Sequence, residues 1–319
     1  MSGGRRITQS DLLQWSILNQ ATKNEDAKDT PGAARTLEPI DKKWIEIILG
    51  KDDSVRMREC VETFTNPHNP LETRILSLDE LELLIESIDN ANNLRPLNLW
   101  KPIIAALDDP DPRVRQYVAW VLGTAIQNNP TSQKDFLESG GLDPIMDRLV
   151  KDPDADARAK AAYCISGLLK HNTEALSLYK AKEGFRLFNV ALKQPQNAAT
   201  QKRIVFCLKN LLDMTDDEDE SYRTAAHLVA REVEVEGILD SVQSIVSGIV
   251  DMQDAHFDTD LVEKILLFIA TLAKRHPNTI FLMSRHKLVE SIKKLRVGGD
   301  GGVDAELVKE TIRALNEVM

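Results

Sequence analysis

The stretches AAYCISGL (residues 161–168) and IVFCLKNL (residues 204–211) carry apolar side chains at the same four positions. These positions, i, i+3, i+4 and i+7, form the buried stripe of a packed α-helix. Three further segments fit this template. The five sets are Leu81, Leu84, Ile85 and Ile88; Val118, Val121, Leu122 and Ala125; Ala161, Cys164, Ile165 and Leu168; Ile204, Cys207, Leu208 and Leu211; and Ile265, Phe268, Ile269 and Leu272. They follow one another at intervals of 37, 43, 43 and 61 residues, so the chain repeats with a period near 43.

A second set of helices is expected between these long segments. Gly141 precedes one of them, with Asp143 expected as N-cap and Pro144 at the first helical position. Gly184, which lies 43 residues after Gly141, and Gly237 precede the equivalent helices. The unit therefore consists of a short helix, a second helix after a glycine turn, and a long third helix.

This three-helix unit is the armadillo arrangement, whereas HEAT repeats pair two helices; a period of about 40–47 residues fits both. One unit cannot bury its apolar stripe alone, so we expect the units to stack. The predicted fold is all-α, a right-handed superhelical solenoid of armadillo repeats with a flexible N-terminal segment.

The predicted organisation has four parts. Residues 1–38 form a flexible N-terminal segment, 39–70 N-terminal capping helices, 71–297 the armadillo repeats, and 298–319 a loop and C-terminal capping helix. The flexible segment contains an apolar island of Leu12, Leu13, Trp15, Ile17 and Leu18. The last interval between stripes, of 61 residues, contains the acidic run 216–220. We interpret this run as a solvated loop or as a segment that attracts a basic partner.

Composition and charge disfavour several partners. The chain has 319 residues and a formal net charge of −10, so phosphate backbones and anionic membranes are poor electrostatic partners. No apolar run reaches the roughly 20 residues of a membrane span, and the N-terminus lacks the apolar core of a signal peptide. Cys60, Cys164 and Cys207 are expected to be reduced core residues. We therefore expect a cytoplasmic protein.

The sequence offers no constellation for catalysis. It contains no P-loop, no Gly-x-Gly-x-x-Gly after a strand and no Gly-x-Ser-x-Gly elbow. Its six histidines lack metal-ligand spacing, and the glycine cluster at 298–302 is interpreted as a loop. We expect neither an enzyme nor a cofactor or metal.

Polar strings follow the expected third helices, which would line the concave surface of the solenoid. The candidate contact residues there are Asn90, Ala91, Asn92, Asn93, Gln127, Asn128, Asn129, Lys170, His171 and Asn172. Asn and Gln can donate and accept hydrogen bonds to a partner. The alternative is that the asparagines cap the C-terminal ends of their helices.

Several strings resemble the Fes/HspBP family of armadillo nucleotide exchange factors for the seventy-kilodalton heat-shock chaperone, Hsp70. They are LLQWSI (12–17), LIESIDNANN (84–93), LWKP (99–102) and GTAIQNN (123–129), the last followed by Ser132, Gln133 and Phe136. The resemblance covers nearly the whole chain, is strongest at 71–172, and favours the cytosolic fungal Fes-like branch. The last third departs more from the family pattern.

The resemblance implies that the concave face clamps one lobe of the Hsp70 nucleotide-binding domain, opens the cleft and releases ADP and then the client. It also places a basic contact residue at Arg203. Ala91 would lie on the contact surface, where Ala91→Arg would abolish binding while the fold is retained. The apolar island would contact the Hsp70 substrate-binding domain and promote client release; the alternative is a helix docked on the first repeat.

A peptide-binding adaptor or scaffold is the alternative function. Adaptors of the nuclear-import type use ladders of Trp and Asn on successive third helices. Only Trp120 is expected on a third helix, which disfavours this function.

Overall fold

The structure is a computed structural model that describes residues 51–194, 197–251, 257–280, 282–299 and 302–318. Within these ranges the chain is helical, and the one extended pairing is an isolated bridge between Val297 and Val303. The apolar island and residues 39–50 of the expected capping region lie outside the described residues.

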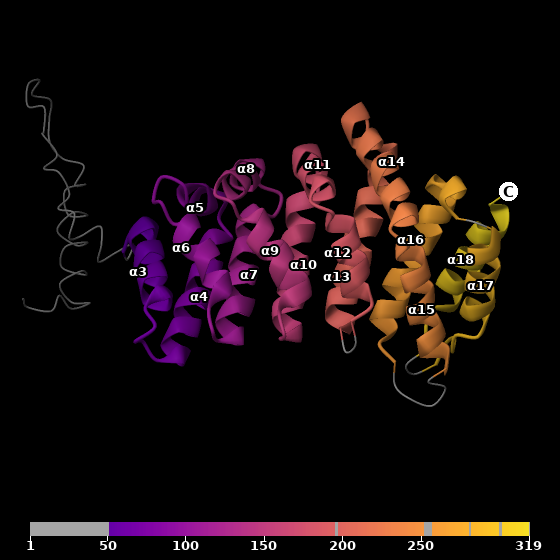
Figure 1. The fold of residues 1–319 in the computed structure, drawn as a ribbon, viewed down its shortest axis with the longest axis horizontal. Helices are drawn as coiled ribbons and strands as arrows, with labels where there is room; N and C mark the ends of the chain where they lie inside the picture. Colours follow the sequence, from indigo (N-terminus) through magenta and orange to yellow (C-terminus); the bar gives the residue numbers. More distant parts are fainter. Residues whose placement is uncertain (1–50, 195–196, 252–256, 281, 300–301, 319) are drawn as a thin grey trace, which may run out of the picture. The chain divides into compact units, whose positions relative to one another are not determined.

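Among the described residues, six long helices, which follow one another along the stack, form the first of three rows (Figure 1). They are α4 (Leu71–Ile85), α7 (Pro112–Ile126), α10 (Ala155–Leu169), α13 (Ala198–Asp213), α16 (Thr259–Arg275) and α18 (Ala305–Glu317). Each packs against the next in this order, and α3 (Asp53–Thr65) packs against α4. Their apolar stripes meet between neighbours, where Val118, Ile165 and Leu208 are completely buried.

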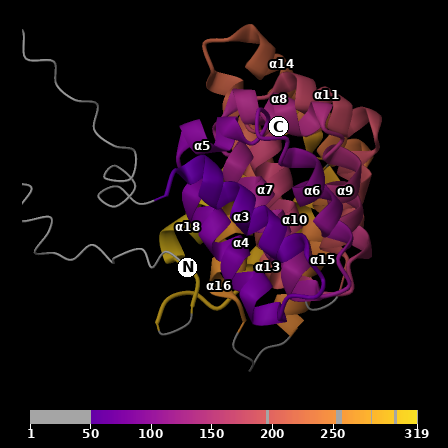
Figure 2. The same cartoon turned by 90° about the vertical axis from the view of Figure 1, so that its left-hand side faces the viewer.

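The other two rows complete the repeat. The second helices are α6 (Trp100–Ala105), α9 (Leu142–Lys151), α12 (Gly184–Leu192), α15 (Ile238–Asp251) and α17 (Leu282–Lys293). The first helices are α5 (Ile88–Asn93), α8 (Pro130–Glu138), α11 (Thr173–Ala181) and α14 (Glu220–Val235), which gather at one edge when the stack is viewed from α3 (Figure 2). This order of first, second and long helices confirms the predicted all-α armadillo stack.

The prediction for the first apolar stripe is correct for Leu81, Leu84 and Ile85, which are buried on α4, and wrong for Ile88. Helix α4 ends at Ile85, and Ser87 is extended, with φ −71° and ψ 125°, before α5 begins. Ile88 therefore lies on α5, where it is 61% exposed. The buried stripe of α4 extends toward the start of the helix, through Leu78 and Ile75, rather than to Ile88.

The second helix of the next repeat also begins differently from the prediction. Helix α9 starts at Leu142 with Gly141 as its N-cap, so Asp143 does not cap it. Asp143 is exposed and forms an ion pair with Lys182 at 2.7 Å. The chain at Gly141 turns back onto the ring of Phe136, and a Cβ at this position would overlap that ring. Gly184 meets Tyr179 in the same way one period later.

The acidic run 216–220 contains an exposed loop, as expected, because Glu218 and Asp219 are exposed between two helices, and its ends also take part in those helices. Asp219 is the N-cap of α14, and its carboxylate accepts a hydrogen bond from Ser221 N at 2.8 Å. Asp216 ends the 3-10 helix Met214–Asp216 and forms an ion pair with Arg275. The extra residues of the last interval lengthen α14 to 16 residues and α15 to 14, against 9 for α8 and 10 for α9.

Arg115 on α7 joins two repeats inside the stack. Its Nε and Nη2 donate to the two carboxylate oxygens of Asp152 at 2.7 and 2.8 Å, and its Nη1 donates to Asp109 O at 2.9 Å. Burial raises the pKa of Asp152, but the bonds from Arg115 and from Asp154 N outweigh it, so that this pKa lies below its ordinary value. One repeat earlier, Arg74 pairs with Asp109 through Nη2 alone, and its Nε donates to Phe64 O at 2.6 Å.

We predict opposite effects on stability for two Gly→Ala substitutions. Gly141→Ala forces a methyl group into the buried Phe136 ring, and overpacking of this kind costs about 1–3 kcal/mol. Gly248→Ala in α15 meets open space and gains about 0.5–1 kcal/mol because alanine is the better helix former. Urea unfolding followed by circular dichroism measures both, and wild-type stability of Gly141→Ala would contradict the tight contact.

Candidate partner-binding surface

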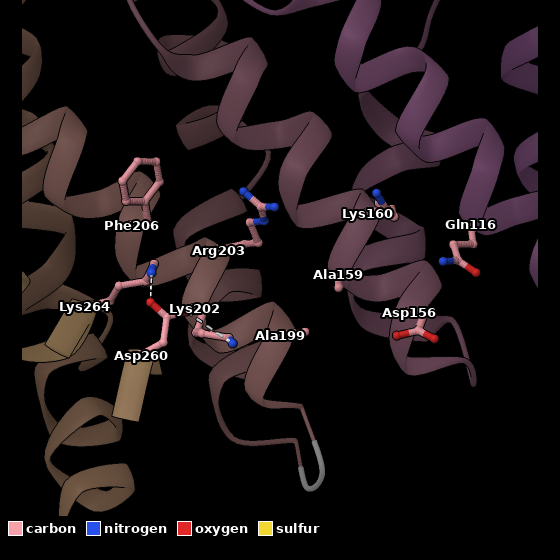
Figure 3. Close-up of a pocket in the computed structure, with 10 residues that line it drawn as sticks. All are labelled: Gln116, Asp156, Ala159, Lys160, Ala199, Lys202, Arg203, Phe206, Asp260 and Lys264. Carbon is pink, nitrogen blue, oxygen red and sulfur yellow. Dashed lines mark hydrogen bonds and ion pairs between the residues drawn. The ribbon is translucent and has the colours of Figure 1, made fainter. Parts of the chain in front are cut away.

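The solvent-facing sides of four consecutive long helices form a hollow of about 550 Å³ (Figure 3). We call this side of the row the long-helix face. It is lined by Gln116, Asp156, Ala159, Lys160, Ala199, Lys202, Arg203, Phe206, Asp260 and Lys264, which lie on α7, α10, α13 and α16. Four cations and two carboxylates line the hollow, so it is positive on a chain whose net charge is −10.

Aromatic side chains occupy equivalent positions on three of these helices. Trp120, Tyr163 and Phe206 are spaced by 43 residues, and each stands next to the core stripe of its helix. Trp120 and Tyr163 are partly buried, and Phe206 is 43% exposed. Tyr163 also donates a hydrogen bond from its hydroxyl to Gln127 Oε1 at 2.9 Å. We call these three side chains the aromatic rungs.

Two cations of the chain lie against the rungs. The Nζ of Lys160 is 3.7 Å from the ring centre of Trp120 and 5.9 Å from that of Tyr163. The guanidinium carbon of Arg203 is 5.2 Å from the ring centre of Tyr163. Burial lowers the pKa of Lys160, and the positive charge of Arg203 lowers it further. Burial also raises the pKa of Tyr163.

The remaining charges of the hollow are largely paired among themselves. Lys202 forms ion pairs with Asp258 at 3.1 Å and with Asp260 at 3.3 Å. Lys264 pairs with Asp260 as well (Figure 3). In the part of the chain that the structure describes, no ion pair involves Lys160 or Arg203. These two are therefore the cations left for a partner.

The structure places the predicted polar strings at the edge formed by the first helices. Asn129 is the N-cap of α8 and accepts a hydrogen bond from Ser132 N at 3.3 Å. Asn172 is the N-cap of α11 and accepts from Ala175 N at 2.9 Å. These two asparagines therefore do cap helices, as the alternative interpretation expected. They cap the N-terminus of the next helix, however, and not the C-terminus of the previous one.

Other members of the strings hold neighbouring helices together. Asn90 donates to Leu84 O and to Asp53 Oδ2, both at 2.9 Å, and thereby links α4 to α3. Asn92 accepts a hydrogen bond from Ser132 Oγ at 3.3 Å. Asn128 and His171 have positive φ of 52° and 50° in the turns before α8 and α11. The exposed members of the strings are Asn93, Gln127, Asn128, Lys170 and His171.

The expectation that Ala91 lies on the surface is wrong. Ala91 is 2% exposed and belongs to the hydrophobic core. The position at which α4 ends explains this result, since residues 88–93 form the separate helix α5 and do not extend α4. Arg203, in contrast, is exposed on the long-helix face as expected.

Sequence reasoning missed the aromatic rungs and Lys160. The nuclear-import pattern consists of a ladder of tryptophans, whereas tyrosine and phenylalanine occupy the second and third rungs here. The 43-residue period carries the missing signal, because it relates Trp120 to Tyr163 and Phe206, and Lys160 to Arg203.

The described residues offer little for chemistry. Burial raises the pKa of Cys60 and Cys207 to about 12, so their thiols stay protonated and unreactive. No group of three or more metal-ligating side chains occurs among the residues that were placed. No helix in the described ranges is long and apolar enough to cross a membrane.

Comparisons with known proteins assign two regions. Residues 10–94 match the family described as nucleotide exchange factor Fes1, and residues 90–296 match the SIL1/FES1/HPBP1 C-terminal domain. Three relatives are each called Hsp70 nucleotide exchange factor FES1. The protein of Mycosarcoma maydis is 32% identical, over 63% of this chain and 54% of its own length. That of Kluyveromyces lactis is 34% identical, over 64% and 70%, and that of Schizosaccharomyces pombe is 30% identical, over 68% and 74%.

Solved structures support the fold alone. A designed armadillo repeat protein covers 82% of this chain and is itself fully covered, with a TM-score of 0.58 at 15% identity. Another, in complex with peptide (KR)4, has a TM-score of 0.56 at 16% identity, over 82% of this chain and 98% of that one. The chain thus spans about half of the first fungal relative named above and nearly all of these designed repeats.

We predict that Ala91→Arg unfolds the first repeat. A buried, unpaired guanidinium is among the few changes that cost more than about 4 kcal/mol. Asn93→Arg is the matched control, because Asn93 is exposed on the same short helix and its replacement changes stability by about 0.5 kcal/mol or less. Urea unfolding compares the two, and equal stability of both variants with the wild type would contradict the burial of Ala91.

Proposed function

The chain belongs to the family of Fes1 and SIL1/FES1/HPBP1 proteins, and we propose that it is an Hsp70 nucleotide exchange factor that acts by binding rather than by catalysis. The observation that carries the proposal is the match of residues 10–296 to these two domain families. The long-helix face supports it, because it offers aromatic side chains and an arginine, which are enriched in interface hot spots.

The proposed mechanism is differential binding. The long-helix face holds one lobe of the Hsp70 nucleotide-binding domain and binds the conformation with an open cleft more tightly than the closed, ADP-bound one. Linkage then requires that ADP binds more weakly to the complex, by the same factor. A hundredfold preference corresponds to about 2.7 kcal/mol. The factor needs no nucleotide site of its own.

We place the protein in the cytoplasm. Its three cysteines are free and buried, which fits a reducing compartment. The polar edge residues Asn93, Gln127, Asn128, Lys170 and His171 remain candidates for additional contacts with the same partner.

The exchange activity has a direct test. Labelled ADP is bound to full-length Hsp70, and its release is followed in stopped flow after addition of excess unlabelled nucleotide with or without this protein. We expect the wild type to accelerate release, and Arg203→Ala to slow the accelerated rate by about tenfold or more, equivalent to about 1.4 kcal/mol.

Arg186→Ala is the control for that experiment. Arg186 is exposed on α12, in the second row, and contacts Glu183 at 3.0 Å rather than the hollow. Its removal leaves the release rate unchanged. A wild-type protein that does not accelerate ADP release would refute the proposed function.

We also propose that the N-terminal apolar island, Leu12, Leu13, Trp15, Ile17 and Leu18, promotes client release at the Hsp70 substrate-binding domain. Tethering raises the effective concentration of such a segment at a second site. Deletion of residues 1–36 is expected to preserve ADP release and to slow the dissociation of a fluorescent client peptide, measured by anisotropy. Equal impairment of both processes would instead indicate a structural cap.

A further inference from the structure

The aromatic rungs create slots between neighbouring long helices. Packed helices lie about 8–10 Å apart, and a cation binds an aromatic ring within about 6 Å of its centre. A slot between two rungs on adjacent helices therefore has room for one cationic side chain that touches both rings. Such slots would suit the lysines and arginines of an extended basic peptide.

In this chain the slots hold the chain's own cations. Lys160 lies within 6 Å of both Trp120 and Tyr163, which places its ammonium group in the first slot. Arg203 lies against the ring of Tyr163. It also lines the hollow together with Phe206, which lies on the same helix (Figure 3). A basic peptide would have to displace both side chains and would also meet their charge.

The two cations lie near the same ring: Lys160 Nζ is 5.9 Å and the guanidinium carbon of Arg203 is 5.2 Å from the ring centre of Tyr163. The positive charge of Arg203 lowers the pKa of Lys160, which is the mark of like charges in proximity. Asp156 and Glu82 oppose this effect, but neither forms an ion pair with Lys160 among the described residues. A carboxylate brought by a partner would relieve the repulsion and gain a charge-assisted hydrogen bond, which is worth about 1.5–3 kcal/mol.

We propose that Lys160 and Arg203 determine the specificity of the long-helix face: they close its aromatic slots to basic peptides and present a paired cationic site to a carboxylate-bearing segment of the partner. The identity of that partner as Hsp70 rests on the proposed function. The closure of the slots does not, because it follows from the geometry of this chain alone.

The first experiment empties the slots. A fluorescein-labelled octapeptide of alternating Lys and Arg is titrated with the wild type and with the Lys160→Ala/Arg203→Ala variant, and anisotropy reports binding. We expect the double variant to bind at least about tenfold more tightly than the wild type. Adding Trp120→Ala to the double variant should abolish the gain. No gain, or a gain that survives Trp120→Ala, would overturn the closure of the slots.

The second experiment tests the carboxylate. Binding to full-length Hsp70 with ADP is measured for the wild type, for Lys160→Arg and for Lys160→Gln/Arg203→Gln. We expect the arginine variant to retain affinity and the glutamine variant to lose at least about tenfold, with a weaker dependence on salt concentration because ion pairs are screened. Wild-type affinity of the glutamine variant would refute the cationic site.

The two proposals fail in different ways. If the wild type does not bind Hsp70, the proposed function fails, while the octapeptide experiment still decides whether the slots are closed. Thermal unfolding of each variant is followed in parallel. Lys160 and Arg203 point to the solvent side of their helices, so melting temperatures close to that of the wild type are expected.

Discussion

Buried arginines on α4, α7 and α10 fix how these long helices pack against the next repeat. Arg115 binds both carboxylate oxygens of Asp152, which lies at the start of the turn before the next long helix. Breaking a buried pair of this kind leaves an uncompensated charge and costs about 3–5 kcal/mol. The fork of the guanidinium tolerates little sliding, so each pair favours one register of neighbouring helices. Between α10 and α13, Arg158 Nε donates to Oδ1 of the neutral Asn197 at 3.4 Å, which is a weaker contact than the two ion pairs.

The register set inside the stack prepares the surface outside it. An α-helix has 3.6 residues per turn, so a slip of one sequence position would rotate each side chain by about 100° about the helix axis. With the register held, residues 43 apart stand at the same height on successive helices. That is why Trp120, Tyr163 and Phe206 form a row and why Lys160 and Arg203 reach the rings beside them.

Much of the repeat architecture was predictable from the sequence, because apolar periodicity reports which face of a helix is buried. The template could not show where a helix ends. It extended α4 past Ile85, and this error moved Ile88 and Ala91 onto the wrong helix. The strings Asp109-Pro110-Asp111 and Asp152-Pro153-Asp154, spaced by 43 residues, carry a better signal. Asp109 and Asp152, which begin these strings, pair with Arg74 and Arg115, respectively. The two arginines are 41 residues apart in the sequence, and this spacing gives the register of α4 relative to α7. The contacts of Lys160 depend on side-chain positions in three dimensions, which a spacing rule does not provide.

A rigid face with fixed cations suits a factor that must favour one conformation of its partner. The long helices are packed along their length, and interiors of this density do not deform continuously, so the partner has to adapt. A free lysine loses about 1.5–2 kcal/mol of rotamer freedom when a partner immobilises it. Lys160 already lies on the ring of Trp120, and part of that loss has occurred before binding. In the proposed mechanism, the free energy of each new ion pair is then available to favour the open lobe over the closed one. The contacts that we propose to close the slots to basic peptides would therefore also serve the proposed exchange mechanism.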